Sequence, residues 1–207
     1  MDTNNEGLIL ASSSPYRKLQ MARLGHQFTT QSPNIDETRL AGEPPLDLVK
    51  RLSYQKALAV QASFPNSTII GSDQVAYMKE EGSSISLSDV KILTKPRTVA
   101  NAIQQLSACS GKSVRFVTGL CCLSTQHDAE VIAEYVDVTF RELSEHEIEN
   151  YINIEKPLDC AGSFKVEGLG ITLFQKIEST DPNTLIGLPL IALNNILIGI
   201  GYNSLLK

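Results

Sequence analysis

Residues 8–17 read Leu-Ile-Leu-Ala-Ser-Ser-Ser-Pro-Tyr-Arg, and this stretch decides how the fold begins. The apolar run at residues 8–11 predicts a short buried strand. Ser14 followed by Pro15 predicts the start of a helix that continues to about Leu24. Serine is a favoured N-cap, and proline is tolerated at the first helical position because an N–H group there would have no helical partner.

The start of this helix also has the features of an anion site. Its first backbone N–H groups and the positive end of its dipole would face the same way as the hydroxyls of Ser12 and Ser14. Arg17 follows within the first turn. These groups predict a site for phosphate, while a capped surface helix with no ligand remains the alternative because Ser-Pro begins many ordinary helices.

Length and composition favour a single domain over residues 1–207, built either as one body or as two lobes that share a sheet. The chain has 207 residues, of which 42% are hydrophobic and 20% charged, enough to bury a sizeable core. The formal net charge is −5. Because nucleic acids and anionic membranes attract basic surfaces, we expect neither as a partner, and any phosphate-binding charge must be local.

Three further features indicate a cytoplasmic protein. Asp2 and Glu6 precede only a few apolar residues, so we expect no secretory signal. The apolar stretch at residues 188–200 falls short of the roughly 20 residues that a bilayer requires. The cysteines lack CxxC spacing, and neighbours on a strand face opposite sides, which favours reduced thiols over a zinc site or a disulfide scaffold. They are Cys109, Cys121, Cys122 and Cys160.

The remaining chain alternates between predicted strands and helices, which indicates an α/β fold. Predicted strands cover residues 27–31, 68–76, 113–125, 130–142 and 171–177. Predicted helices cover residues 46–64, 97–108 and 144–154, and a last one begins at Pro189. Ser144 and Glu147 have the spacing of a capping box at the start of the third helix. Residues 32–45 are expected to form a loop, and residues 78–94 a mobile loop or a hairpin excursion.

The strand at 68–76 turns polar partway along, which places Ser72, Asp73 and Gln74 at its expected far end. Strand ends are where α/β proteins place their sites. An acid that follows a buried apolar run needs a partner, so Asp73 is a candidate functional residue on these grounds alone.

The charges of the polar clusters form a coherent set. Arg17, Lys56, Lys95 and Lys165 supply enough positive charge to balance a nucleoside triphosphate, while Glu37 and Asp73 could hold a divalent cation and a water. Taken singly, these residues have plainer interpretations. Lys56 could be a solvated residue of a helix, Lys95-Pro96 an ordinary turn, and Asp36-Glu37 a solvated part of a loop.

The order of these motifs along the chain resembles the signature set of the Maf family. The matching segments are residues 10–17, Asp36-Glu37, Lys56-Ala57, residues 71–75, Lys95-Pro96, residues 160–165, Glu167-Gly168 and residues 181–189. The resemblance implies a cytoplasmic nucleoside triphosphate pyrophosphatase. It also implies a fold similar to that of the inosine triphosphate pyrophosphatases, with a mixed twisted sheet flanked by helices and two lobes around a central cleft.

The resemblance also implies roles for individual residues. Asp73 matches the proton acceptor, and Tyr16, Gln74 and Glu167 match positions that distinguish substrates. The resemblance implies a divalent metal, Mg²⁺ or Mn²⁺, and a homodimer. On the helix-start and charge arguments above, the phosphate-binding residues would be Ser12, Ser14, Arg17, Lys56, Lys95 and Lys165, and Glu37 would be a ligand of the metal.

Within the family, the pattern resembles the subgroup that hydrolyses 7-methyl-GTP. Methylation at N7 makes guanine cationic, so it would stack favourably on Tyr16, and the Glu167 carboxylate could accept its N1–H and N2–H bonds. The chain departs from the subgroup at Tyr16, where tryptophan is usual, and at Thr94, where glycine usually precedes the Lys-Pro pair. Two other hypotheses remain open: hydrolysis of other nucleotides such as dTTP and UTP, and a non-catalytic nucleotide-binding regulator of cell division or septum formation.

Overall fold

The computed structural model describes residues 7–79 and 90–206. Its α-helices are α1 (Pro15–Ala22), α2 (Pro45–Gln61), α3 (Val99–Cys109), α4 (Glu145–Glu155) and α5 (Leu190–Gly199). Its strands are β1 (Leu8–Ala11), β2 (Phe28–Thr30), β3 (Thr68–Met78), β4 (Ile92–Leu93), β5 (Ser113–Leu123), β6 (Glu130–Phe140) and β7 (Phe174–Ser179). Short 3-10 helices are η1 (Ala161–Ser163), η2 (Leu169–Leu173), η3 (Thr184–Ile186) and η4 (Ser204–Leu206).

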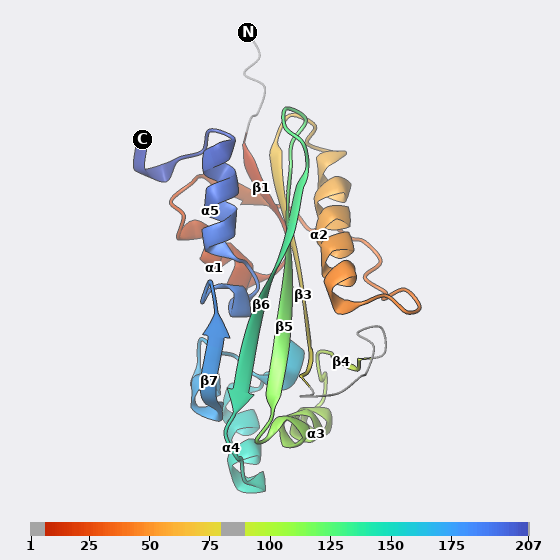
Figure 1. The fold of residues 1–207 in the computed structure, drawn as a ribbon, viewed down its shortest axis with the longest axis vertical. Coiled ribbons are helices and arrows are strands. Elements are labelled where there is room, and N and C mark those ends of the chain that lie inside the picture. The colour runs from red at the N-terminus through yellow and green to blue at the C-terminus, as the bar shows by residue number, and fades with distance from the viewer. Residues whose placement is uncertain (1–6, 80–89, 207) are drawn as a thin grey trace. The chain divides into compact units, whose positions relative to one another are not determined.

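The strands form one mixed sheet in the order β2-β1-β3-β5-β6-β7, with β4 paired to β3 (Figure 1). β1 runs parallel to both β2 and β3, and its register places Leu8 opposite Thr68 and Ala11 opposite Gly71. β4 and β7 are antiparallel to β3 and β6, respectively. The structure therefore confirms the expected α/β class, a mixed sheet flanked by helices.

The chain divides into two compact units. The first consists of Met1–Gln74, Thr118–Glu134 and Asp181–Lys207, and the second of Val75–Val117 and Tyr135–Thr180. The strands β3, β5 and β6 each contribute residues to both units.

In the first unit, successive strand residues alternate between two apolar layers. α5 and α2 lie on opposite sides of β1 and β3 (Figure 1). The layer toward α5 contains Leu8, Leu10, Met21, Ile70, Leu120, Cys122, Leu193 and Leu197, among others. The layer toward α2 contains Ile9, Ala11, Ala57, Val60, Ile69, Cys121 and Leu123. Each fully buried aliphatic side chain contributes about 1.5–3 kcal/mol, so this two-sided packing holds the strands that carry the site in place.

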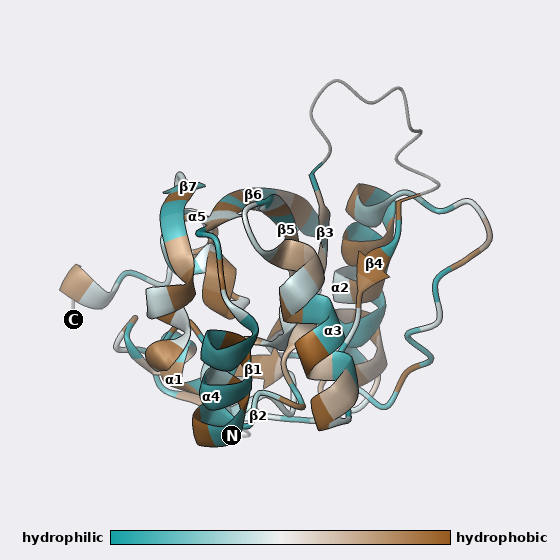
Figure 2. Cartoon of the chain, turned by 90° about the horizontal axis from the view of Figure 1, so that it is seen from below, coloured by the Kyte–Doolittle hydropathy of each residue, from teal (hydrophilic) through white to brown (hydrophobic). Residues whose placement is uncertain are grey.

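In the second unit, an aromatic cluster and a capped helix are prominent. Phe164 packs edge-on against Phe116 and Phe174, with ring centroids 5.4 and 4.9 Å apart. The Ser144 and Glu147 side chains form the predicted capping box at the start of α4. Figure 2 shows that α3 and α4 carry both hydrophilic and hydrophobic residues, as expected for helices with one buried face.

The structure confirms most predicted elements and changes some bounds. The strand at residues 8–11, the Ser14 cap and the first helical position of Pro15 are as expected, although α1 ends at Ala22 rather than near Leu24. α3 begins two residues later than predicted because the Thr98 hydroxyl accepts the backbone N–H of Asn101 and thus caps the helix. Cys121 and Cys122 lie in opposite layers, as predicted.

Two predictions about strands were wrong. β3 continues to Met78, so Ser72, Asp73 and Gln74 lie in its middle and not at its far end. Their neighbour β1 is the strand that ends here, because its last residue, Ala11, pairs with Gly71.

The predicted strand at 171–177 begins only at Phe174, and the residues before it form η2. The Lys165 carbonyl oxygen accepts the N–H groups of Gly168 and Gly170, and this local bonding turns the chain before it can join the sheet. Of the predicted excursion at 78–94, residues 92–93 form β4, and residues 80–89 lie outside the described part.

A search of the described helices finds none that is long and apolar enough to cross a membrane. All four cysteines are free thiols. Burial raises the pKa of the Cys109, Cys121 and Cys122 thiols to about 12, which makes them inert at neutral pH.

Candidate active site

The first turn of α1 presents hydroxyls and an arginine. The Ser14 Oγ atom accepts the Arg17 backbone N–H at 3.3 Å, and the Ser12 Oγ atom accepts the Ser14 N–H at 3.1 Å. Both oxygens act here as acceptors, so each hydroxyl can still donate its proton to a ligand. Tyr16, half-buried, is the second residue of the same helix.

The carbonyl oxygen of Gly187 joins Arg17 to the sheet. It accepts a hydrogen bond from Arg17 Nε at 2.8 Å and another from Ser72 Oγ at 2.8 Å. Gly187 has a φ of +117°, and a Cβ atom there would lie 3.2 Å from Arg17 Nε. Glycine is therefore suited to this position both by its backbone conformation and by the space available.

The centre of the site is a buried ion pair between α2 and β3. Lys56 Nζ lies 2.6 Å from Asp73 Oδ1 and 2.8 Å from Glu37 Oε1. The Lys56 and Asp73 side chains are only 6% and 9% exposed, whereas that of Glu37 is 58% exposed. One ammonium group thus bridges a buried carboxylate and a carboxylate that faces solvent.

Arg17 belongs to the same electrostatic cluster. Burial lowers the pKa of its guanidinium, and the negative charges of Asp73 and Glu37 oppose that shift. The arginine stays cationic at neutral pH. The structure therefore brings together two cations, Arg17 and Lys56, and two carboxylates, Glu37 and Asp73, from four separate parts of the sequence.

Two glycines allow α2 to lie directly on the sheet. A Cβ atom on Gly71 would lie 2.1 Å from the Ser53 carbonyl oxygen, and one on Gly119 would lie 2.2 Å from the Val49 carbonyl oxygen. Lys56 follows Ser53 by about one helical turn, and Asp73 lies two residues beyond Gly71 on the same face of β3. The close approach at Gly71 is what lets the ammonium reach the carboxylate.

The loop that carries Glu37 is held by contacts that the sequence analysis missed. Arg51 of α2 binds the Glu43 carboxylate through Nε at 2.6 Å and Nη2 at 2.7 Å, and Nη2 also donates to the Thr38 carbonyl oxygen. This pairing holds the pKa of Glu43 below its usual range. The only signal of this pair in the sequence was its spacing, because Glu43 lies eight residues before Arg51, near the start of a predicted helix.

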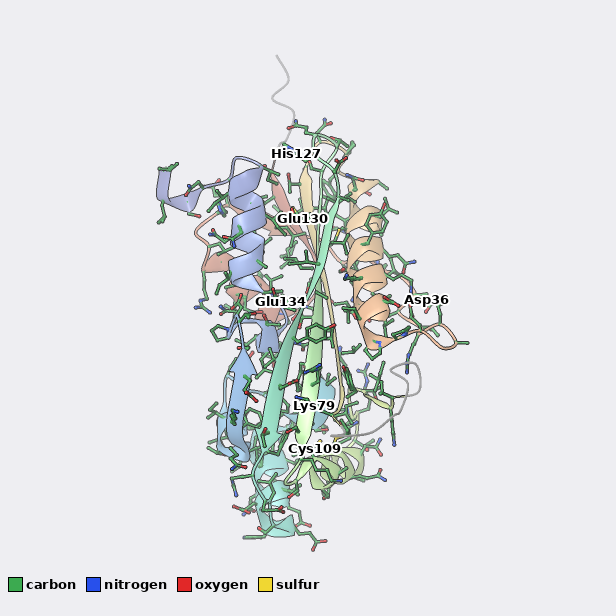
Figure 3. The ribbon with its side chains drawn as sticks, in the orientation of Figure 1. Asp36, Lys79, Cys109, His127, Glu130 and Glu134 are labelled. Atoms are coloured by element: carbon green, nitrogen blue, oxygen red, sulfur yellow. The ribbon has the colours of Figure 1, made fainter. Side chains whose placement is uncertain are left out.

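Asp36 and Glu37 have separate roles in that loop. The Asp36 carboxylate accepts the N–H and the hydroxyl of Thr38, so it forms a local turn on the segment before α2 (Figure 3). Asp36 therefore shapes the loop through these hydrogen bonds and is more than the solvated residue of the plainer interpretation. Glu37 is the residue of the pair that reaches Lys56.

Gln74 lies on the other face of β3 from Asp73, together with Ser72. Its Nε2 atom donates to Thr118 Oγ1 at 2.9 Å, to the Thr184 carbonyl oxygen at 2.9 Å and to the Leu185 carbonyl oxygen at 3.2 Å. The alternation of β3 thus directs the acid toward α2 and the amide toward residues 184–187.

The other predicted site residues belong to the second unit. Lys95 is exposed in the segment after β4, and Glu167 is exposed between η1 and η2. Lys165 is half-buried: its Nζ atom donates to the Glu155 carbonyl oxygen at 3.0 Å, and its backbone N–H donates to the Tyr151 hydroxyl at 2.9 Å. Phe164, anchored in the aromatic cluster, fixes the chain directly before Lys165.

The first unit also has a polar cavity of about 290 Å³ that includes none of the predicted site residues. Thr68, Ser124 and His127 contribute to its lining, and His127 lies at the turn between β5 and β6 (Figure 3).

The fold and the charged cluster define a class of protein. It is an α/β protein in which a helix N-terminus, two cations and two carboxylates gather where the parallel strand β1 ends. Such a set can bind an anion and accept a proton. Residues 7–200 match the model of the Maf family, which is described as Maf-like protein. Because this match covers most of the chain, the chain belongs to the Maf family.

Several relatives and one solved structure resemble the whole chain. It is 48% identical over 196 residues to a 7-methyl-GTP pyrophosphatase of Nitrosococcus oceani, a match that covers 94% of each protein. It is 50% identical over 191 residues to a 7-methyl-GTP pyrophosphatase of Pseudomonas putida, covering 92% of this chain and 94% of that one. The Ham1 protein of Staphylococcus aureus has a similar fold, with a TM-score of 0.51 and 11% identity over 94% of this chain and 100% of that chain.

Proposed function

We propose that this protein hydrolyses 7-methyl-GTP to 7-methyl-GMP and pyrophosphate. One observation carries the proposal: a buried carboxylate, Asp73, pairs with Lys56 beside Arg17 in the first unit. The substrate is supported by the near full-length likeness to relatives named for that activity.

In the proposed mechanism, Asp73 acts as the proton acceptor. It takes a proton from a water molecule as the water oxygen forms a bond to the α-phosphorus. The bond between the α-phosphorus and the bridging oxygen breaks, and pyrophosphate leaves with the electron pair of that bond. Lys56 fixes the Asp73 carboxylate through the 2.6 Å contact.

The acidic residues fit a divalent cation. Mg²⁺ prefers hard oxygen ligands and is held in many sites by one or two carboxylates together with substrate phosphates. Within the described residues no group of three or more His, Cys, Asp or Glu could hold a metal by itself, so phosphate oxygens would have to complete the set. We propose Glu37 as the ligand, because its carboxylate is largely exposed yet lies against the same ammonium as Asp73. When bound, Mg²⁺ or Mn²⁺ would neutralise charge on the phosphates.

The triphosphate would be bound by hydroxyls and cations. Ser12, Ser14 and Arg17 supply donors at the start of α1, where the helix dipole favours an anion. Lys56, Lys95 and Lys165 complete the proposed phosphate-binding set. The Lys56 ammonium has three N–H groups and contacts two carboxylates in this structure, so its third N–H group would be available to a phosphate oxygen.

The base would be recognised by Tyr16, Gln74 and Glu167. A cationic 7-methylguanine gains from stacking on the Tyr16 ring, and the Glu167 carboxylate can accept its N1–H and N2–H bonds. Glu167→Gln should therefore reduce turnover of 7-methyl-GTP far more than that of UTP.

A nucleotide panel with product identification tests the proposal. The purified protein is incubated with Mg²⁺ and 7-methyl-GTP, GTP, dTTP or UTP, and the products are separated by chromatography. We expect 7-methyl-GMP and pyrophosphate as the main products, and a loss of at least about 10²-fold in kcat for Asp73→Asn. Asp137→Asn is a matched control, because Asp137 also pairs with a lysine, at 2.7 Å, but has no proposed role.

Other outcomes would change the conclusion in defined ways. Faster release of pyrophosphate from dTTP or UTP would show that the reaction is as proposed but that the preferred substrate is a pyrimidine nucleotide. Tight nucleotide binding without any product would show that the protein binds nucleotides and does not hydrolyse them. We further propose a cytoplasmic location and a homodimer; light scattering of the purified protein tests the latter.

A further inference from the structure

The amide of Gln74 is held in one orientation by its neighbours. Its Nε2 atom lies within 3.2 Å of three oxygens, two of which are the carbonyl oxygens of Thr184 and Leu185. Carbonyl oxygens only accept hydrogen bonds, so the group that faces them must be the NH₂ end of the amide.

Thr118 completes this assignment from the neighbouring strand β5. Its hydroxyl has one proton, which it donates to the Thr184 carbonyl oxygen at 3.0 Å. Toward Gln74 Nε2, 2.9 Å away, the same oxygen can therefore only accept. Thr118 is fully buried, at 0% exposure, and a buried polar group that loses its partner is costly. The two side chains thus fix each other.

We propose that Thr118 is a positioning residue that turns the Gln74 amide so that only its Oε1 atom can bind the nucleotide. This inference rests on the proposed function, in which Gln74 contacts the base. The two N–H bonds of the amide are already shared among three oxygens of the protein, so Gln74 does not donate to a base carbonyl. It accepts from an NH₂ group, such as the N2 amino group of guanine, which keeps one proton when Glu167 accepts the N1–H and the other N2–H.

Substitutions at Thr118 separate this role from simple packing. In Thr118→Val a methyl group replaces the hydroxyl at 2.9 Å from Nε2 and 3.0 Å from the Thr184 carbonyl oxygen. Carbon contacts require about 3.5 Å or more, so the amide of Gln74 must move. Thr118→Ser keeps the hydroxyl, and Thr118→Ala removes it without adding bulk.

The measurement is kcat/KM for 7-methyl-GTP relative to UTP. We expect Thr118→Val and Thr118→Ala to lower this ratio by about five- to tenfold, the effect of one lost hydrogen bond, mainly through a higher KM. Thr118→Ser should stay within about twofold of the wild type, since the hydrogen bond is kept. Thermal unfolding of each variant checks that the fold is retained.

A double-mutant cycle with Gln74→Ala decides whether Thr118 acts through Gln74. In the Gln74→Ala background, Thr118→Val and Thr118→Ala should cause little further change in the ratio, because the group that they displace is gone. A ratio that is unchanged in both single variants, or a loss that is fully additive with Gln74→Ala, would overturn the positioning role alone. A wild-type protein that releases no pyrophosphate from any nucleotide would instead overturn the proposed function, and this role with it.

Discussion

Substitution of Gly71 by alanine should separate Lys56 from Asp73 without changing a charged residue. The new Cβ atom would lie 2.1 Å from the Ser53 carbonyl oxygen and 3.0 Å from the Ala57 backbone nitrogen. The first distance is more than about 1 Å short of van der Waals contact. Because both neighbours are backbone atoms inside α2, a 17-residue helix, the helix and the strand must move apart.

The expected cost follows from this geometry. Overpacking of a core costs about 1–3 kcal/mol or somewhat more, and we expect the upper part of that range because no flexible side chain can yield. For a chain of this size, 3 kcal/mol corresponds to a fall in Tm of roughly 6–12 °C. A shift of about 1 Å would also lengthen the 2.6 Å contact between Lys56 and Asp73, and such a displacement can reduce kcat about 10²-fold.

Calorimetry and steady-state turnover of 7-methyl-GTP measure the two effects. Gly199→Ala is the matched control, because a Cβ atom there meets nothing within 4 Å. Its stability should stay within about 0.5 kcal/mol of the wild type. If Gly71→Ala were as stable and as active as Gly199→Ala, the argument that close approach at Gly71 positions the ion pair would be wrong.

Three further predictions concern charges. Lys56→Met should lower the free energy of unfolding, measured by urea titration, by about 3–5 kcal/mol, because it leaves Asp73 buried without its partner. The double variant Lys56→Met with Asp73→Leu should recover most of that loss. Hydrogen bonds from Ser144 are the main cause that lowers the pKa of Glu147 from 4.5 to about 2. The Glu147 carboxylate therefore stabilises the fold above pH 4.5, and this stabilisation is lost as the pH falls toward 2. Glu147→Gln should flatten the pH dependence of the free energy of unfolding between pH 4.5 and 2, and an unchanged profile would contradict the assignment. Chelation with EDTA should abolish pyrophosphate release and excess Mg²⁺ should restore it, while full activity in EDTA would remove the proposed metal.

Much of the fold could be predicted because its signals are local. The apolar run of β1, the Ser14 cap and Pro15 lie within eight consecutive residues, and the capping box of α4 lies within four. Periodicity also predicted α2, since burial of one stripe of a helix leaves a regular pattern.

What the sequence could not show are contacts between distant residues. Gly187 accepts bonds from Arg17 and Ser72, which precede it by 170 and 115 positions, and its sequence context indicates only a turn. The placement of Asp73 in the middle of β3 was missed for a related reason: polar residues within a strand mimic a strand end when their partners come from other elements.

The strict alternation along β3 has a consequence for how this protein can vary. Odd-numbered positions Ile69, Gly71 and Asp73 face α2, while the even-numbered Ile70, Ser72 and Gln74 face the opposite layer. Deleting or inserting a single amino acid before Asp73 would exchange the two sets. Asp73 would then face the layer that now contains Gln74, and Gln74 would face Lys56 on α2. This segment should therefore accept some replacements of individual side chains in a mutational scan but no change in its length.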